Sequence, residues 1–145
     1  MLDIHHQLYI NAPCSKVFVA ISSQHGLSKW WGDTKDLRTD FGAMIPFMSN
    51  DQSVQTLKIV DAKIAEYLIW KCVAGSDHWL GTEIMFQLKP EGKGTKLCFK
   101  HSGWSKSDDN YAAVNFLWSR KLIFLKALCE TGKIAPDYLQ ELKDN

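Results

Sequence analysis

The sequence contains no long hydrophobic run and no excess of charge of either sign. Seventeen basic residues stand against sixteen acidic ones, which gives a formal net charge of +1. This balance argues against a nucleic-acid-binding surface and against a polyanionic tail. Residues 1–10 alternate in polarity and carry Asp3 where a leader would be basic, so we expect no signal peptide, no membrane span and a cytoplasmic location.

Closely spaced cysteines and cofactor motifs are also missing. The cysteines are Cys14, Cys72, Cys98 and Cys129. They form no C-x-x-C pair, which favours reduced thiols in the core over a zinc site or a disulfide framework. His5 and His6 are adjacent, so in a strand they point to opposite faces and cannot share a metal ion. No glycine-rich phosphate loop, nucleophile elbow or paired Glu/His motif occurs, and we expect neither a metal nor a cofactor.

What the sequence does contain is one long segment with the period of an α-helix, residues 110–131. Its apolar stripe consists of Tyr111, Val114, Leu117, Trp118, Leu122, Leu125, Leu128 and Cys129. Spacings of three and four residues place these side chains on one face of a helix of about six turns. Residues 107–110 supply N-capping oxygens, and Gly132 follows as a C-cap. A second stripe, formed by Phe116, Ile123 and Ala127, predicts that the helix is largely enclosed.

Most of the chain before this helix has the pattern of β-strands. The expected strands are residues 4–10, 43–48, 54–61, 67–73, 82–89 and 95–102, and a loop at residues 90–94 joins the last two as a hairpin. Short helices are expected at residues 13–22 and 27–31, and one or two helical turns at residues 138–142. The hydrophobic content is 46% and no flexible linker occurs. We therefore expect one α+β domain, residues 1–145, whose antiparallel sheet curls around the long helix.

Several short strings occur in a fixed order along nearly the whole chain. They are Asn11-Ala12-Pro13 with Val17-Phe18, Lys29-Trp30-Trp31-Gly32, Gly81-Thr82-Glu83, Gly94-Thr95-Lys96-Leu97 and His101-Ser102-Gly103-Trp104. Together they resemble the helix-grip superfamily, SRPBCC, which includes START domains and the birch-pollen allergen. Within it, the chain is most similar to the activator of heat shock protein 90 ATPase homologue 1-like domains.

This resemblance implies a fold and a cavity rather than a reaction. The implied helix-grip fold is a curved antiparallel sheet around a long C-terminal helix, with two short helices after the first strand and a cavity between sheet and helix. The chaperone activators also carry a separate N-terminal domain for the chaperone's middle region. The present sequence has no room for such a domain, and this departure puts co-chaperone activity in doubt.

Two polar side chains fall on faces that are expected to be apolar. His101 follows Leu97 and Phe99 on the inner face of a strand, where it is either an acid, base or ligand-orienting group or a histidine hydrogen-bonded across the sheet. Lys121 lies within the apolar arc of the long helix, where it either meets an anionic ligand group or extends to solvent along the helix. The sequence leaves both pairs of alternatives open.

Aromatic side chains complete the expected site. The tryptophans lie at positions 30, 31, 70, 79, 104 and 118. An indole buries a large area and keeps one N–H donor, which suits a flat or long apolar ligand, although ordinary core packing explains the same residues. We place Trp31 and Trp104 at the cavity rim. The predicted cavity residues are Trp31, Phe86, Phe99, His101, Trp104, Trp118 and Lys121.

The leading functional hypothesis is a small cytoplasmic domain that binds an apolar small molecule, which can carry a carboxylate, without catalysing a reaction. One alternative is an aromatase/cyclase-like or hydrolytic enzyme that uses His101 and Lys121 in the same cavity. Another is a chaperone-associated interaction module of the stress-response type, marked by an exposed apolar patch. A monomer and a homodimer are both compatible with the sequence.

Overall fold

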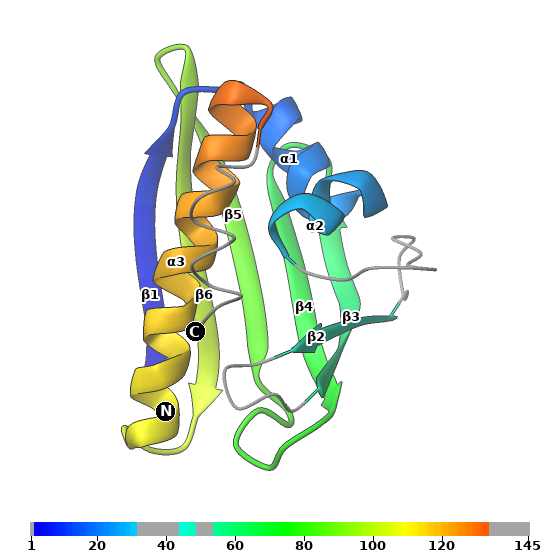
Figure 1. Cartoon of the computed structure of the whole chain (residues 1–145), viewed down its shortest axis with the longest axis vertical. Helices are drawn as coiled ribbons and strands as arrows, with labels where there is room; N and C mark the ends of the chain where they lie inside the picture. The colour runs from blue at the N-terminus through cyan, green and yellow to red at the C-terminus, as the bar shows by residue number, and fades with distance from the viewer. Residues whose placement is uncertain (1, 32–43, 49–53, 134–145) are drawn as a thin grey trace.

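The computed structural model describes residues 2–31, 44–48 and 54–133, and its elements follow the expected order. They are β1 (Leu2–Ile10), α1 (Cys14–Ser22), α2 (Gln24–Trp30), β2 (Met44–Met48), β3 (Val54–Lys63), β4 (Tyr67–Ala74), β5 (Glu83–Glu91), β6 (Gly94–Trp104) and α3 (Asp109–Thr131). The strands form one six-stranded antiparallel sheet in the order β1-β6-β5-β4-β3-β2. The long helix α3 lies across one face of this curved sheet, beside α1 and α2 (Figure 1). The helical turns predicted at residues 138–142 lie outside the described residues.

The inner face of the sheet follows the predicted alternation. On β5 and β6, Phe86 pairs with Phe99 and Ile84 pairs with His101, and all four side chains are buried. Their sequence neighbours, such as Lys100, point to the opposite face and are more exposed. Period-two patterning therefore identified the buried side of these two strands.

The β5–β6 hairpin is tighter than the predicted loop at residues 90–94. Pro90 pairs with Thr95, and Glu91 pairs with Gly94, so only residues 92 and 93 form the turn. Gly92 has a φ of 58°, a conformation that glycine adopts without strain and that a two-residue hairpin requires. Pro90 is tolerated because it lies beyond Gln87, the last β5 residue paired with β4, so its missing N–H faces no neighbouring strand.

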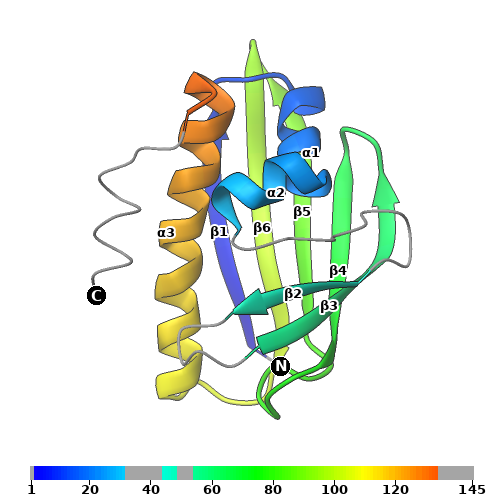
Figure 2. The same ribbon diagram turned by 45° about the vertical axis from the view of Figure 1, so that its right-hand side comes forward.

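Both ends of α3 are capped as predicted, but the helix is not largely enclosed. The Asp108 carboxylate accepts a hydrogen bond from the Tyr111 backbone N–H at 3.1 Å, and Gly132 ends the helix with a φ of 74°. Phe116 is 63% exposed and Ile123 is 55% exposed, so the prediction of enclosure was wrong. The sheet, α1 and α2 all lie on one side of α3, and its other side faces outward (Figure 2).

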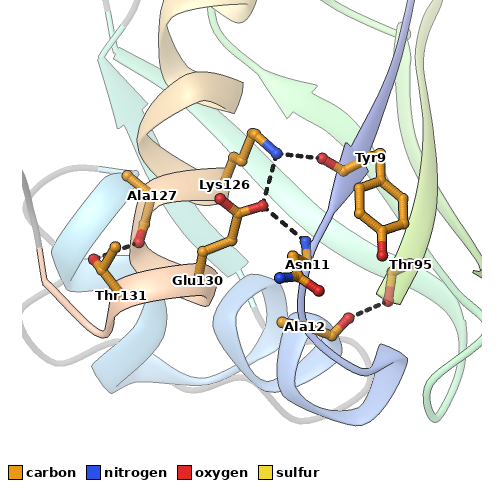
Figure 3. A network of polar contacts seen from close by, with 8 residues as sticks. All are labelled: Tyr9, Asn11, Ala12, Thr95, Lys126, Ala127, Glu130 and Thr131. Carbon is orange, nitrogen blue, oxygen red and sulfur yellow. Dashed lines mark hydrogen bonds and ion pairs between the residues drawn. The ribbon is translucent and has the colours of Figure 1, made fainter. Parts of the chain in front are cut away.

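The C-terminal part of α3 is tied to the end of β1 by a polar network (Figure 3). The Lys126 ammonium donates to the Tyr9 carbonyl and to the Glu130 carboxylate, both at 2.6 Å. Glu130 also accepts from the Asn11 backbone N–H at 2.7 Å. These bonds fix how α3 is placed along the first strand.

The N-terminal part of α3 is tied to the other end of β1. The Tyr111 hydroxyl donates to the Asp3 carbonyl at 2.9 Å. The Tyr111 ring also lies edge-on to Trp104, with 5.9 Å between centroids. The helix is thus held over the sheet at both of its ends.

Across residues 2–31, 44–48 and 54–133, no helix combines the length and hydrophobicity that a membrane crossing requires. The same part of the chain brings together no group of three or more His, Cys, Asp or Glu side chains suited to hold a metal ion.

Candidate ligand-binding site

All predicted cavity residues except Lys121 are buried in one aromatic cluster between the sheet and α3. They are Trp31, Phe86, Phe99, His101, Trp104 and Trp118, each at most 2% exposed. The Phe99 ring centroid lies 5.2 Å from that of Phe86 and 4.7 Å from that of Trp118. Trp31 and Trp104 are buried within the cluster rather than placed at a rim, because they contact Trp118 and His101, at 5.6 and 4.9 Å between centroids.

The cluster also contains aromatic residues that the sequence-based prediction did not include, among them Phe47, Trp70 and Trp79. Phe47 on β2 stacks on Trp118 with 5.1 Å between centroids and 9° between ring planes. Trp79, from the β4–β5 connection, lies 4.6 Å from the His101 ring. Trp70 on β4 lies 6.3 Å from Trp31 between ring centroids. A loop residue such as Trp79 carries no periodic signal that could have placed it in the cluster.

The polar centre of the cluster is a chain of hydrogen bonds through His101. The Trp118 indole N–H donates to His101 Nδ1 at 3.1 Å, and His101 Nε2 lies 2.8 Å from the Thr82 hydroxyl. Since an indole can only donate, Nδ1 is the acceptor and Nε2 carries the proton. Thr82 then donates to the Trp79 carbonyl at 2.6 Å. Both ring nitrogens of His101 are therefore engaged in hydrogen bonds, one to Thr82 and one to Trp118.

Burial keeps this imidazole neutral. His101 is fully buried, and desolvation lowers its pKa from 6.5 to about 3. The described residues place no carboxylate on either ring nitrogen to offset this effect. His101 is therefore a neutral hydrogen-bonding group near physiological pH and does not change its charge there.

Three indole N–H groups in the cluster, those of Trp70, Trp79 and Trp104, have no hydrogen-bond acceptor among the described residues. Trp30 and Trp31, by contrast, donate to the carbonyls of Ala20 and Pro46, at 2.8 and 3.3 Å. Nine-tenths or more of buried polar groups in proteins are paired, and an unpaired one costs roughly 1–3 kcal/mol. An oxygen atom supplied from outside the chain would be stabilised beside these three donors.

The Lys121 side chain crosses from α3 to the end of α2. Its ammonium donates to the Trp31 carbonyl at 2.9 Å and lies 5.9 Å from the Phe47 ring centroid. Trp31 is the C-cap of α2, where a cation is favoured by the helix dipole. Burial, and to a smaller extent the charge of Arg120, lowers the pKa of Lys121 from 10.5 to about 8. A ligand carboxylate at Lys121 would have to compete with this backbone carbonyl.

Solved structures share this architecture. The Aha1 dimer from Colwellia psychrerythraea, determined in solution, is 32% identical over 92% of this chain and 99% of its own, with a TM-score of 0.80. A protein from Mesorhizobium loti matches at 19% identity over 88% of this chain and 96% of its own, with a TM-score of 0.72. CalU16 from Micromonospora echinospora matches at 18% identity over 98% of this chain and 82% of its own, with a TM-score of 0.74. The latter two likenesses show the fold alone.

The family is established by sequence as well as by structure. No curated protein matches the chain. The family model described as "Activator of Hsp90 ATPase homolog 1-like protein" matches residues 11–130. This range begins directly after β1 and contains all later elements except the last residue of α3. The chain therefore belongs to the Activator of Hsp90 ATPase homolog 1-like family, with the SRPBCC helix-grip fold.

Proposed function

We propose that the chain binds a small, largely apolar molecule bearing hydrogen-bond-accepting oxygens, between the sheet and α3. The observation that supports this most directly is the set of buried, unpartnered indole N–H groups of Trp70, Trp79 and Trp104. Each is a donor on the edge of a flat apolar ring. The complementary ligand is a flat or elongated apolar body with a carbonyl or carboxylate oxygen.

Binding without catalysis agrees with the polar groups of the cluster. An aromatase/cyclase-like or hydrolytic reaction would need His101 or Lys121 as an available acid or base. His101 uses both ring nitrogens in hydrogen bonds, and its pKa of about 3 removes it from proton transfer near neutral pH. Lys121 is bound to the Trp31 carbonyl. These observations support a carrier or sensor rather than an enzyme.

A ligand bound in the cluster would contact several aromatic rings. Rings such as those of Phe99 and Trp118, with 4.7 Å between their centroids, are in direct contact. A ligand therefore changes the surroundings of several tryptophans at once, and tryptophan fluorescence should report its binding. Native mass spectrometry of protein purified from its own host would show directly whether an apolar molecule copurifies.

A matched pair of probes tests the role of the indole donors. We expect 2-acetylnaphthalene to bind about 5- to 10-fold more tightly than 2-ethylnaphthalene, which has a similar shape but no acceptor oxygen. Trp79→Phe and Trp104→Phe should each reduce this preference, because each removes an unpartnered donor. Fluorescence titration gives both affinities for each protein. Adding 2-naphthoic acid to the panel with Lys121→Met measures any contribution of that ammonium to carboxylate binding.

Trp30→Phe is the control for these substitutions. It makes the same chemical change at a buried indole whose N–H already donates to the Ala20 carbonyl. It should therefore retain the preference for the ketone. Equal affinities of the parent for the two probes, or an unchanged preference in Trp79→Phe and Trp104→Phe, would contradict the proposal.

Self-association through the outer side of α3 is a second candidate function. Phe116 and Ile123 lie two turns apart on the helix and are 63% and 55% exposed. The Arg120 guanidinium lies over the Phe116 ring, 4.9 Å from its centroid, which places a cation beside this apolar stripe. The Colwellia relative, at 32% identity, is described as a dimer. An exposed apolar stripe on a helix suits the equivalent stripe of a second copy.

Sedimentation equilibrium tests this candidate. We expect the parent to dimerise and the double variant Phe116→Ser/Ile123→Ser to dissociate, with a dimer Kd raised by at least about 10-fold. Ile64→Ser is the control, because Ile64 is 80% exposed in the β3–β4 turn, away from α3. A monomeric parent, or a double variant that associates like the control, would rule out this surface.

A further inference from the structure

A groove outside the aromatic cluster lies between α1, α2 and the C-terminal end of α3. Its volume is about 230 Å³. Leu128 and Cys129 of α3 and Val19 of α1 give it apolar walls, and Lys16 and Lys29 are also among its lining residues. None of these residues belongs to the interior site proposed above. The groove has its own chemistry, which is an apolar surface beside positive charge.

The walls of the groove are held by close packing of α1 on α2. Ser23 alone separates the two helices, and its hydroxyl accepts the Gly26 backbone N–H at 3.0 Å. Gly26 approaches Ala20 so closely that a Cβ at position 26 would lie 2.6 Å from the Ala20 Cα and carbonyl oxygen. The Trp30 indole also donates to that carbonyl. The groove is therefore a fixed feature of the fold rather than a gap between loosely packed helices.

The charge in the groove is uncompensated among the described residues. Its lining includes Lys16, Lys29 and His25 but no Asp or Glu. The described salt bridges join other residues and leave both lysines without an acidic partner. Glu130, the acid next in sequence to the lining, is already bound by Lys126 and by the Asn11 N–H. An anion bound in the groove would lie beside two lysines and no acidic residue of the lining.

The thiol of Cys129 does not supply a negative charge either. Cys129 is buried, and desolvation raises the pKa of its thiol to about 11, although the nearby Lys16 ammonium acts in the opposite direction. The thiol is therefore protonated at neutral pH and contributes apolar surface to the groove floor. This leaves the lysines as the charged groups that select the ligand.

We propose that this groove is a binding site for a small amphipathic carboxylate, whose apolar body packs on Val19, Leu128 and Cys129 while its carboxylate meets Lys16 and Lys29. The groove is smaller than the about 300–1,000 Å³ typical of sites for drug-sized ligands. A short acyl chain or a single aromatic ring therefore matches it better than a long-chain lipid. Two exposed or half-exposed ammonium groups favour an anion without the desolvation cost that a buried lysine carries.

Hexanoate is the probe, followed by amide NMR of the full chain. We expect saturable shifts at the backbone amides of Ser23, Gly26 and Gly132, which line the groove, and no shift at the indole N–H groups of Trp79 and Trp104 in the interior. Acetate, which has the charge but no apolar body, and 1-hexanol, which has the body but no charge, should each bind at least about 10-fold more weakly.

The double variant Lys16→Met/Lys29→Met tests the role of the two ammonium groups. It should weaken hexanoate by at least about 10-fold while leaving 1-hexanol unchanged. Lys71→Met is the matched control, because Lys71 is an exposed lysine on β4 and not part of the lining. Equal binding of hexanoate to the double variant and to the control would overturn the proposal. So would shifts centred on the interior indoles, an outcome that would leave the interior site standing.

Discussion

Lowering the pH from 8 to 5 should reduce the free energy of unfolding by about 2 kcal/mol through the His101 imidazole alone. Its pKa is about 3 in the folded protein, against 6.5 for an unperturbed histidine. Between these values the unfolded chain binds the proton and the folded chain does not, so stability is complete above pH 6.5 and is lost as the pH falls. Over the whole window the loss amounts to about 5 kcal/mol. Urea titrations at several pH values measure it.

Replacing His101 isolates its contribution from that of the other titrating groups. His101→Asn removes the titration and should flatten the dependence between pH 8 and 5, at the cost of lower stability at pH 7 because the Thr82 hydroxyl loses its partner. His5→Asn is the control, since His5 is exposed on β1 and should leave the parent slope intact. NMR of the parent gives a second measurement. If the His101 ring titrates near pH 6.5 while the protein is folded, the prediction fails.

Leu125→Ala should lower the free energy of unfolding by about 2–5 kcal/mol. Leu125 is fully buried in the middle of α3, between Leu122 and Leu128, which are also buried. Alanine removes apolar surface and leaves a cavity that the surrounding side chains fill only in part. Chemical denaturation monitored by circular dichroism gives the difference from the parent.

Ile123→Ala provides the comparison on the same helix. It also shortens a large aliphatic side chain to alanine, but Ile123 is 55% exposed and should change stability by no more than about 0.5 kcal/mol. Similar losses for the two variants would mean that α3 does not pack on the sheet through the face described. If Leu125→Ala were as stable as the parent, the burial of Leu125 against the sheet would be contradicted more strongly.

Much of the fold was predictable from the sequence because helix capping and side-chain alternation depend on residues close together in the chain. Asp108 and Gly132 set the ends of α3 through hydrogen bonds that span only a few residues, so their types indicated their roles. Side-chain alternation likewise indicated that Phe86, Phe99 and His101 face inward. The extent of the β5–β6 hairpin was less predictable, because proline and glycine near position 92 fit a long loop and a tight turn equally well.

The site was less predictable than the fold, because its contacts join residues that are distant in sequence. Trp79 enters the aromatic cluster from a loop, and its position is set by His101 and Trp104, which are distant in sequence. Lys121 was singled out correctly as unusual, but its partner is the Trp31 carbonyl, which only the docking of α2 against α3 brings within reach. The exposure of Phe116 was missed for a similar reason, since periodicity shows which residues share a face and not whether a partner covers it.

The hydrogen bonds between α3 and β1 also restrict how copies of this chain can associate. β1 is an edge strand, and such strands can extend a sheet into a second molecule through their free backbone groups. Here the Tyr9 carbonyl, near one end of the strand, already accepts a hydrogen bond from Lys126 of α3 (Figure 3). The Asp3 carbonyl, near the other end, accepts one from Tyr111. The opposite edge, β2, carries Pro46, which has no N–H to offer. Continuous intermolecular β-sheets, and the fibrils that grow from them, are therefore disfavoured at both edges.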